Sequence, residues 1–163
     1  MSKTEFEAKM RAVTAAIEGL AIDAGLAARL DELFPAGGEA FAAIESLCHK
    51  GVAEGWLCQH ENGGVHYSRP IKPSPETAGF SVDIVKMKDL KGPYHGHPNG
   101  EIDMVMPIDG GAKFDGHGAG WCVYEPGSRH YPAVSDGEAL VLYLLPEGAI
   151  DFTAKPPGYT KER

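Results

Sequence analysis

The most informative part of this chain is residues 95–101, whose sequence is His-Gly-His-Pro-Asn-Gly-Glu. Residues two apart on a β-strand face the same side, so His95 and His97 are expected to point together into a cavity. The Pro-Asn-Gly sequence that follows is typical of a turn, which can bring Glu101 back beside both histidines. Two imidazoles and one carboxylate suit a divalent transition metal with open coordination positions.

A fourth candidate ligand lies downstream. Residues 126–130 have the sequence Pro-Gly-Ser-Arg-His, so His130 follows a Pro-Gly turn at the start of another strand-like run. We predict that His95, His97, Glu101 and His130 share one coordination sphere around a divalent ion of iron, manganese, nickel or zinc. The alternative is a metal-free protein that keeps the same side chains as a polar pocket.

These two segments resemble the two conserved motifs of cupins, which are small β-barrels whose motif residues usually hold one metal ion. The matching patterns are His95-x-His97-x3-Glu101 and Gly120-x5-Pro126-Gly127-x2-His130. The resemblance covers roughly residues 80–150 and implies a mainly β fold of the cupin type, a jelly-roll barrel.

The spacing of strand-like segments in the second half of the chain is consistent with a β-barrel. Short strand-like runs, separated by glycine, proline and aspartate turns, occur at residues 80–87, 101–107, 120–124, 130–134 and 139–145. Several short strands with such punctuation indicate an all-β barrel or jelly roll.

The first half reads differently. Apolar residues at helical spacing predict three helices, at about residues 4–19, 23–34 and 38–50, with Gly51 ending the third. A short β-hairpin follows, with its turn at Asn62-Gly63-Gly64. We expect these helices to cap the barrel or to pack against a second subunit.

The resulting domain organisation has four parts. Residues 1–67 form an N-terminal α-helical extension with a small hairpin, and 68–79 form a proline-rich linker. Residues 80–150 form the cupin barrel, and 151–163 are an irregular C-terminal tail.

The charge and composition of the chain argue against nucleic-acid and membrane partners. The net charge is −8, and residues 1–67 hold five basic against ten acidic side chains, which argues against a helix-and-hairpin DNA reader and against nucleic acid in general. No secretory signal or apolar run of membrane-spanning length is visible, and three unpaired cysteines suit a reducing compartment. We therefore expect a cytoplasmic protein with no membrane partner. We also expect a homodimer, because barrel edges and apolar helix faces need cover.

Several further side chains are candidates for chemistry. Asp103 lies two residues past Glu101 and shares its face, so it is a candidate general acid or base, or else an ordinary strand aspartate. His117, in a hairpin loop, is a weaker candidate for proton transfer. Arg69 or Arg129 could pair bidentately with a substrate carboxylate. Phenol groups could come from Tyr94, Tyr131 and Tyr143, for which core packing is the alternative.

The whole chain is similar to one narrower family, the 4-hydroxylaminobenzoate lyases of bacterial nitroaromatic degradation. The resemblance lies in His-Gly-His-Pro-x-Gly-Glu-Ile-Asp at 95–103, Gly-Trp-Cys-Val-Tyr-x-Pro-Gly-Ser-x-His-x-Pro at 120–132 and Leu-Tyr-Leu-Leu-Pro-x-Gly-Ala-Ile at 142–150. It implies a small aromatic acid as substrate and conversion of 4-hydroxylaminobenzoate to 3,4-dihydroxybenzoate (protocatechuate), with release of ammonia.

The same resemblance suggests roles for the site. A metal or Asp103 would stabilise the departing oxygen, and Glu101 or a histidine would act as base for a water molecule. An arginine would hold the ring carboxylate, while Val105 and Trp121 would line a slot for the ring. Two other classes stay open: a metal-dependent dioxygenase or isomerase acting on a small acid, and a non-catalytic ligand-binding cupin.

Overall fold

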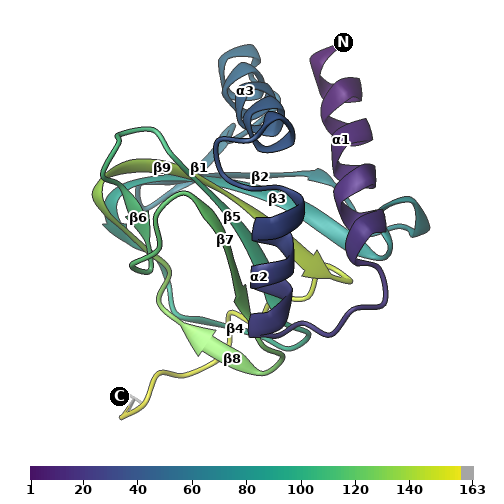
Figure 1. The fold of residues 1–163 in the computed structure, drawn as a ribbon. Helices are drawn as coiled ribbons and strands as arrows, with labels where there is room; N and C mark the ends of the chain where they lie inside the picture. Colours follow the sequence, from purple (N-terminus) through teal and green to yellow (C-terminus); the bar gives the residue numbers. More distant parts are fainter. Residues whose placement is uncertain (159–163) are drawn as a thin grey trace.

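The computed structural model describes residues 1–158 and has three helices packed on a curved antiparallel sheet (Figure 1). The helices are α1 (Ser2–Ile17), α2 (Ala24–Leu33) and α3 (Glu39–Glu54). The strands are β1 (His60–Asn62), β2 (Val65–Ile71), β3 (Phe80–Lys91), β4 (His95–His97), β5 (Glu101–Pro107), β6 (Lys113–Phe114), β7 (Gly120–Tyr124), β8 (Ser128–His130) and β9 (Ala133–Pro146). A single 3-10 turn, Pro75–Thr77, precedes β3.

The strands form a large sheet and a small one. The large sheet has the order β1-β2-β3-β9-β5-β7, with β6 paired to β9, and every pairing is antiparallel. The small sheet pairs β4 with β8. The predicted mainly β, cupin-type fold with an N-terminal helical extension and hairpin is confirmed.

The large sheet lies between two apolar layers, because successive side chains along its strands point to opposite faces. On β9, Leu140, Leu142 and Leu144 pack in the layer shared with the helices, whereas Val141 and Tyr143 pack in the layer inside the barrel. Alternation with a period of two is the geometric property of a strand. The alternation of inward-facing and outward-facing residues along each central strand therefore decides which side chains can reach an internal site.

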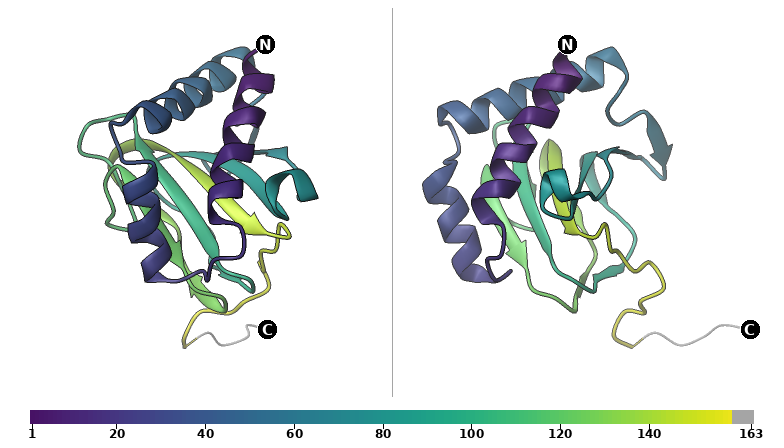
Figure 2. Two further views of the ribbon diagram at one scale, coloured as in Figure 1. Left: turned by 45° about the vertical axis from the view of Figure 1, so that its right-hand side comes forward. Right: turned by 90° about the vertical axis from the view of Figure 1, so that its right-hand side faces the viewer.

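The three helices cover the outer face of the large sheet, as both views in Figure 2 show. Phe6 and Met10 of α1, Leu30 of α2 and Phe41 of α3 are fully or almost fully buried in this outer layer. Burial of such side chains contributes about 1.5–3 kcal/mol each relative to exposure. The helices are therefore a cap on the barrel. None of those in residues 1–158 has the length and apolar character needed to cross a bilayer.

Two helix boundaries differ from the prediction. α1 begins at Ser2 rather than at residue 4, and α3 continues past Gly51 to Glu54. A Cβ at Gly51 would lie 2.6 Å from the Leu57 side chain, so this glycine permits close packing rather than ending the helix. Gly55, in the left-handed conformation with φ of 87°, ends α3 instead.

The predicted linker also needs correction. β2 runs through Ser68–Ile71, and Ile71 pairs with Val82 of β3, so the hairpin and the barrel belong to one sheet. The predicted strand at 130–134 is likewise wrong, because His130 ends β8 and Ala133 begins β9. In the predicted tail, Asp151 pairs with Gly96 and the rest, up to residue 158, is irregular; residues 159–163 lie outside the described part.

Candidate metal centre

The candidate ligands come from β4, β8 and the first residue of β5. In the small sheet, His95 lies opposite His130, which brings two histidines 35 positions apart in sequence to one place. The turn between β4 and β5 is closed by a hydrogen bond from Gly100 N to His97 O of 3.1 Å. Gly100 has φ of 90°, and a Cβ there would lie 2.9 Å from Ile22, so only glycine suits this turn. Glu101 follows directly, with its side chain inside the barrel.

The four side chains converge on one point. His97 Nε2 lies 3.0 Å from His95 Nε2, 3.0 Å from His130 Nε2 and 3.0 Å from Glu101 Oε1. The four donor atoms all lie within 4.8 Å of one another. Ligands at right angles around an ion, bound at about 2.1 Å, would lie about 3.0 Å apart. The predicted convergence is therefore confirmed, with spacing that fits a metal ion.

The hydrogen bonds behind two histidines fix which nitrogen faces this point. His95 Nδ1 donates to Pro93 O at 3.0 Å, and His130 Nδ1 donates to Asp115 Oδ2 at 2.7 Å. Each Nε2 therefore presents a lone pair to the centre. Both carboxylate oxygens of Glu101 are buried without a hydrogen-bond partner among the described residues. Converging lone pairs and an unpartnered carboxylate fit a divalent transition metal ion.

Burial favours the neutral form of His95, His97 and Glu101. Desolvation lowers the pKa of His95 to about 4 and that of His97 to about 3, so both are neutral near pH 7. Neutral imidazole is the form that binds metal. Desolvation also raises the pKa of Glu101 to about 7, which is the cost of placing an unpaired carboxylate here. A cation at the centre would offset that cost.

Asp115 was missed by the sequence analysis. Its carboxylate accepts hydrogen bonds from His130 Nδ1 at 2.7 Å, from the Tyr124 hydroxyl at 2.5 Å and from Ala133 N at 2.9 Å. Although burial acts to raise it, these bonds hold the pKa of Asp115 below its usual range. Asp115 therefore remains charged and orients the His130 ring. The sequence signal for Asp115 is its place in an Asp-Gly turn, and His117 is the residue that the sequence analysis names from the same turn.

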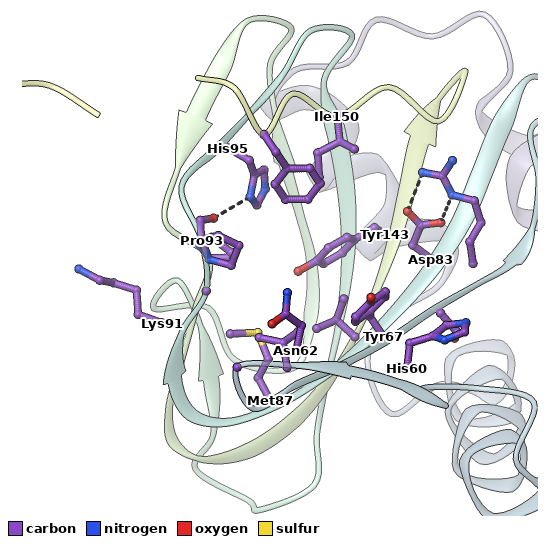
Figure 3. Close-up of a pocket in the computed structure, with 18 residues that line it drawn as sticks. His60, Asn62, Tyr67, Asp83, Met87, Lys91, Pro93, His95, Tyr143 and Ile150 are labelled. Atoms are coloured by element: carbon purple, nitrogen blue, oxygen red, sulfur yellow. Dashed lines mark hydrogen bonds and ion pairs between the residues drawn. The ribbon is translucent and has the colours of Figure 1, made fainter. Parts of the chain in front are cut away.

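A cavity of about 950 Å³ adjoins the candidate metal centre, and the ligand His95 forms part of its wall (Figure 3). This volume is at the upper end of the range of about 300–1,000 Å³ usual for small-molecule sites. Its wall is mixed: apolar and aromatic side chains surround a few polar groups. The residues relevant to chemistry are Arg69, Asp83, Lys91, His95, Tyr143 and Phe152.

Of the side chains predicted to bind substrate, Arg69 and Tyr143 line this cavity. The Nε of Arg69 donates to Asp83 Oδ1 at 2.7 Å and its Nη2 to Asp83 Oδ2 at 3.0 Å. Arg129 is exposed on β8. Tyr94 and Tyr131 pack edge to face, with ring centroids 4.9 Å apart, outside the cavity lining.

Two other predictions are corrected by strand parity and exposure. Trp121 lies on the outer face of the sheet, where its Nε1 donates to Phe34 O at 2.9 Å, so it does not line the cavity. Its neighbour Cys122 faces inward instead. His117 is exposed in the turn next to Phe114 and is not among the converging donors in the described residues.

Asp103 shares the inner face with Glu101, as predicted, but it is fully buried and does not line the cavity. Its Oδ2 lies 3.7 Å from Cys122 Sγ, and its Oδ1 has no hydrogen-bond partner among the described residues. Burial, followed by the negative charge of Glu101, raises the pKa of Asp103 well above its usual value. Asp103 therefore lies behind the site rather than at its surface, and its surroundings favour the protonated form.

An antiparallel barrel that directs three histidines and one glutamate at a single internal point is a cupin with a candidate metal centre. Residues 8–152 match the family model described as PnbB: 4-hydroxylaminobenzoate lyase. The chain belongs to the 4-hydroxylaminobenzoate lyase family.

Individual relatives agree with this assignment. The chain is 38% identical to a 4-hydroxylaminobenzoate lyase of Pseudomonas putida, over 79% of this chain and 83% of that protein. It is 36% identical to a protein of the same name from Nocardioides sp. (strain LMS-CY), over 78% and 81%. Among solved structures, it is similar to an RmlC-like cupin protein from Ralstonia eutropha JMP134, with a TM-score of 0.41 and 15% identity over 52% of this chain and 57% of that one.

Proposed function

We propose that this protein is a 4-hydroxylaminobenzoate lyase, which converts 4-hydroxylaminobenzoate and water to 3,4-dihydroxybenzoate (protocatechuate) and ammonia. Membership of the lyase family supports the reaction. The observation that carries the site is the convergence of four donor atoms beside a cavity that also holds an arginine. We propose in addition that the enzyme is a cytoplasmic homodimer and that its substrate is a small aromatic acid.

His95, His97, Glu101 and His130 would hold the metal ion. A divalent ion there would supply Lewis acidity at the end of the cavity where His95 lies. The chain's own residues keep three of these ligands out of water and fix the orientation of two imidazole rings through Pro93 and Asp115. Such support is what makes a metal site selective and tight.

Arg69 is the group we propose for the ring carboxylate. Guanidinium groups bind carboxylates through paired hydrogen bonds, and Arg69 lines the cavity, whereas Arg129 does not. Asp83 occupies the Nε and Nη2 edge of the guanidinium, and no hydrogen bond among the described residues uses Nη1. In this proposal, Nη1 is the group that binds the substrate anion.

The reaction is redox-neutral and balances with one net water. Cleavage of the N–O bond sends both electrons to oxygen, which leaves as water after taking up a proton. A water molecule then adds to the ring carbon next to the carbon that bears nitrogen, giving an imine. A further water hydrolyses the C=N bond and releases ammonia, and the ring regains aromaticity as the catechol. Stabilising charge on the departing oxygen is the main task of the site.

The decisive experiment is metal analysis of the purified protein combined with a turnover assay on 4-hydroxylaminobenzoate. We expect ammonia and protocatechuate in equal amounts, loss of activity after chelation and recovery when one divalent metal is restored. Oxygen consumption during turnover would instead identify a dioxygenase. Binding of the acid without any product would identify a non-catalytic cupin.

A further inference from the structure

A row of polar side chains crosses the inner face of the large sheet. Asp83 on β3 lies opposite Tyr143 on β9, Tyr143 lies opposite Asp103 on β5, and Asp103 lies opposite Cys122 on β7. Directly opposed residues on neighbouring strands face the same side of a sheet. All four side chains therefore point into the barrel, and Arg69 extends the row through its ion pair with Asp83.

Tyr143 is the member of this row that offers a free polar group to the cavity. Its side chain is buried apart from 6% exposure, and it lines the cavity. Figure 3 shows its hydroxyl extending into the cavity, away from Asp83 and toward the side where Pro93 and His95 lie. No hydrogen bond of this hydroxyl is found among residues 1–158, and it is not one of the fully buried polar atoms without a partner, so it is open to the cavity. A ligand in the cavity can therefore form a hydrogen bond with it.

Tyr143 lies between the two ends of the cavity that we propose for the substrate. Arg69, Tyr143 and His95 all line the cavity. In Figure 3, Tyr143 lies between His95 and Asp83, which is the ion-pair partner of Arg69. A para-substituted benzoate with its carboxylate on Arg69 would extend its hydroxylamino group past Tyr143 toward His95. The phenol would then lie beside the N–O bond.

We propose that Tyr143 is a catalytic residue, whose hydroxyl hydrogen-bonds the hydroxylamine oxygen of the substrate and protonates it as the N–O bond breaks. This inference rests on the proposed lyase function and adds a proton donor to it. Asp103 cannot fill that role directly because it is fully buried and does not line the cavity.

Tyr143 gives up one proton in this step and regains one later, so the protons balance. The bonding electron pair moves to oxygen, the Tyr143 proton moves to the same oxygen, and water leaves. The resulting tyrosinate recovers its proton from the water molecule that adds to the ring. Burial is the main cause that raises the pKa of Tyr143 above its usual value, so the resting hydroxyl carries its proton.

The test is Tyr143→Phe, which removes the hydroxyl and keeps the ring. We expect kcat on 4-hydroxylaminobenzoate to fall about 10²–10³-fold, the usual effect of losing one donor to a developing oxyanion. Bound metal per subunit and the Kd of 4-aminobenzoate, which lacks the oxygen, should stay within about twofold of wild type, since kcat alone depends on the lost donor. Tyr131→Phe is the matched control, because Tyr131 lies outside the cavity lining and should retain wild-type kcat.

Each other outcome counts against the assignment. A Tyr143→Phe enzyme with near wild-type kcat would overturn it and leave the lyase function standing. Loss of metal, or of 4-aminobenzoate binding, that accounts for the lower kcat would show a structural role and overturn it as well. A wild-type enzyme that does not convert 4-hydroxylaminobenzoate would overturn the proposed function first, and the role of Tyr143 with it.

Discussion

At the scale of single residues, Asp115 connects the candidate metal centre to the rest of the barrel. It adopts a left-handed backbone conformation with φ of 50° and bonds a ligand side chain, a phenol and a backbone amide at once. A carboxylate behind a ligating histidine fixes its ring and raises its basicity. We therefore expect Asp115 to act on metal affinity rather than through contact with the substrate.

Asp115→Asn should weaken metal binding about 10–100-fold, as loss of such a partner typically does. Competition with a chromogenic chelator would measure the affinity. Asp136→Asn is a matched control, since Asp136 also has a left-handed conformation, with φ of 61°, but its side chain pairs with Lys113 at the surface. Equal metal affinities for the two variants would contradict the role of Asp115.

Arg69→Lys keeps a positive charge beside Asp83 but removes the planar fork. We expect KM for 4-hydroxylaminobenzoate to rise about 10–100-fold with a smaller change in kcat, equivalent to losing one charge-assisted hydrogen bond of about 1.5–3 kcal/mol. Steady-state kinetics on Arg69→Lys and Arg129→Lys would decide between the two arginines. A raised KM only in Arg129→Lys, or in neither, would point to another cation, with Lys91 the next candidate on the cavity wall.

At the scale of elements, β7 joins the barrel to the helical cap through Trp121. Its ring packs against Phe41 with centroids 6.3 Å apart, and its indole nitrogen bonds the last turn of α2 at Phe34 O. We expect Trp121→Phe to lower the free energy of unfolding by about 1–3 kcal/mol, because a partly buried carbonyl loses its donor. Urea denaturation would measure this.

KM of the same Trp121→Phe variant should stay at the wild-type value, since the side chain faces the helices. A rise in KM together with unchanged stability would restore the idea that Trp121 lines a slot for the substrate ring.

Much of the metal centre could be predicted because its signals are local. Strand periodicity places His95 and His97 on one face, and a proline-glycine turn returns Glu101 to them. Parity failed for Trp121 because β7 has buried residues on both faces, so alternation did not mark the inner one. Register could not be read at all. The row through Tyr143 depends on how strands far apart in sequence align, and no local pattern encodes that alignment.

At the scale of the whole molecule, the helical cap covers only one face of the large sheet, and the edges of that sheet remain. β1 is short and fully exposed at one edge. Exposed edges favour pairing with another chain. We expect a homodimer of the 17.4 kDa chain at micromolar concentration. Sedimentation velocity would test this, and a monomer throughout the concentration range would refute it.

Residues 149–154 pack against the candidate metal centre through backbone hydrogen bonds and one ring contact. Asp151 exchanges two hydrogen bonds of 2.8 Å with Gly96, the residue between two of the ligands, and Phe152 lies over His95 on the cavity wall while remaining 61% exposed. Such a segment is a natural reporter of occupancy. A ligand in the cavity gives Phe152 a second surface to pack on, so cleavage by chymotrypsin at this position should slow when 4-aminobenzoate is added. Digestion time courses would then rank ligands for this enzyme without any catalytic assay, and equal rates with and without ligand would show that the segment does not sense the cavity.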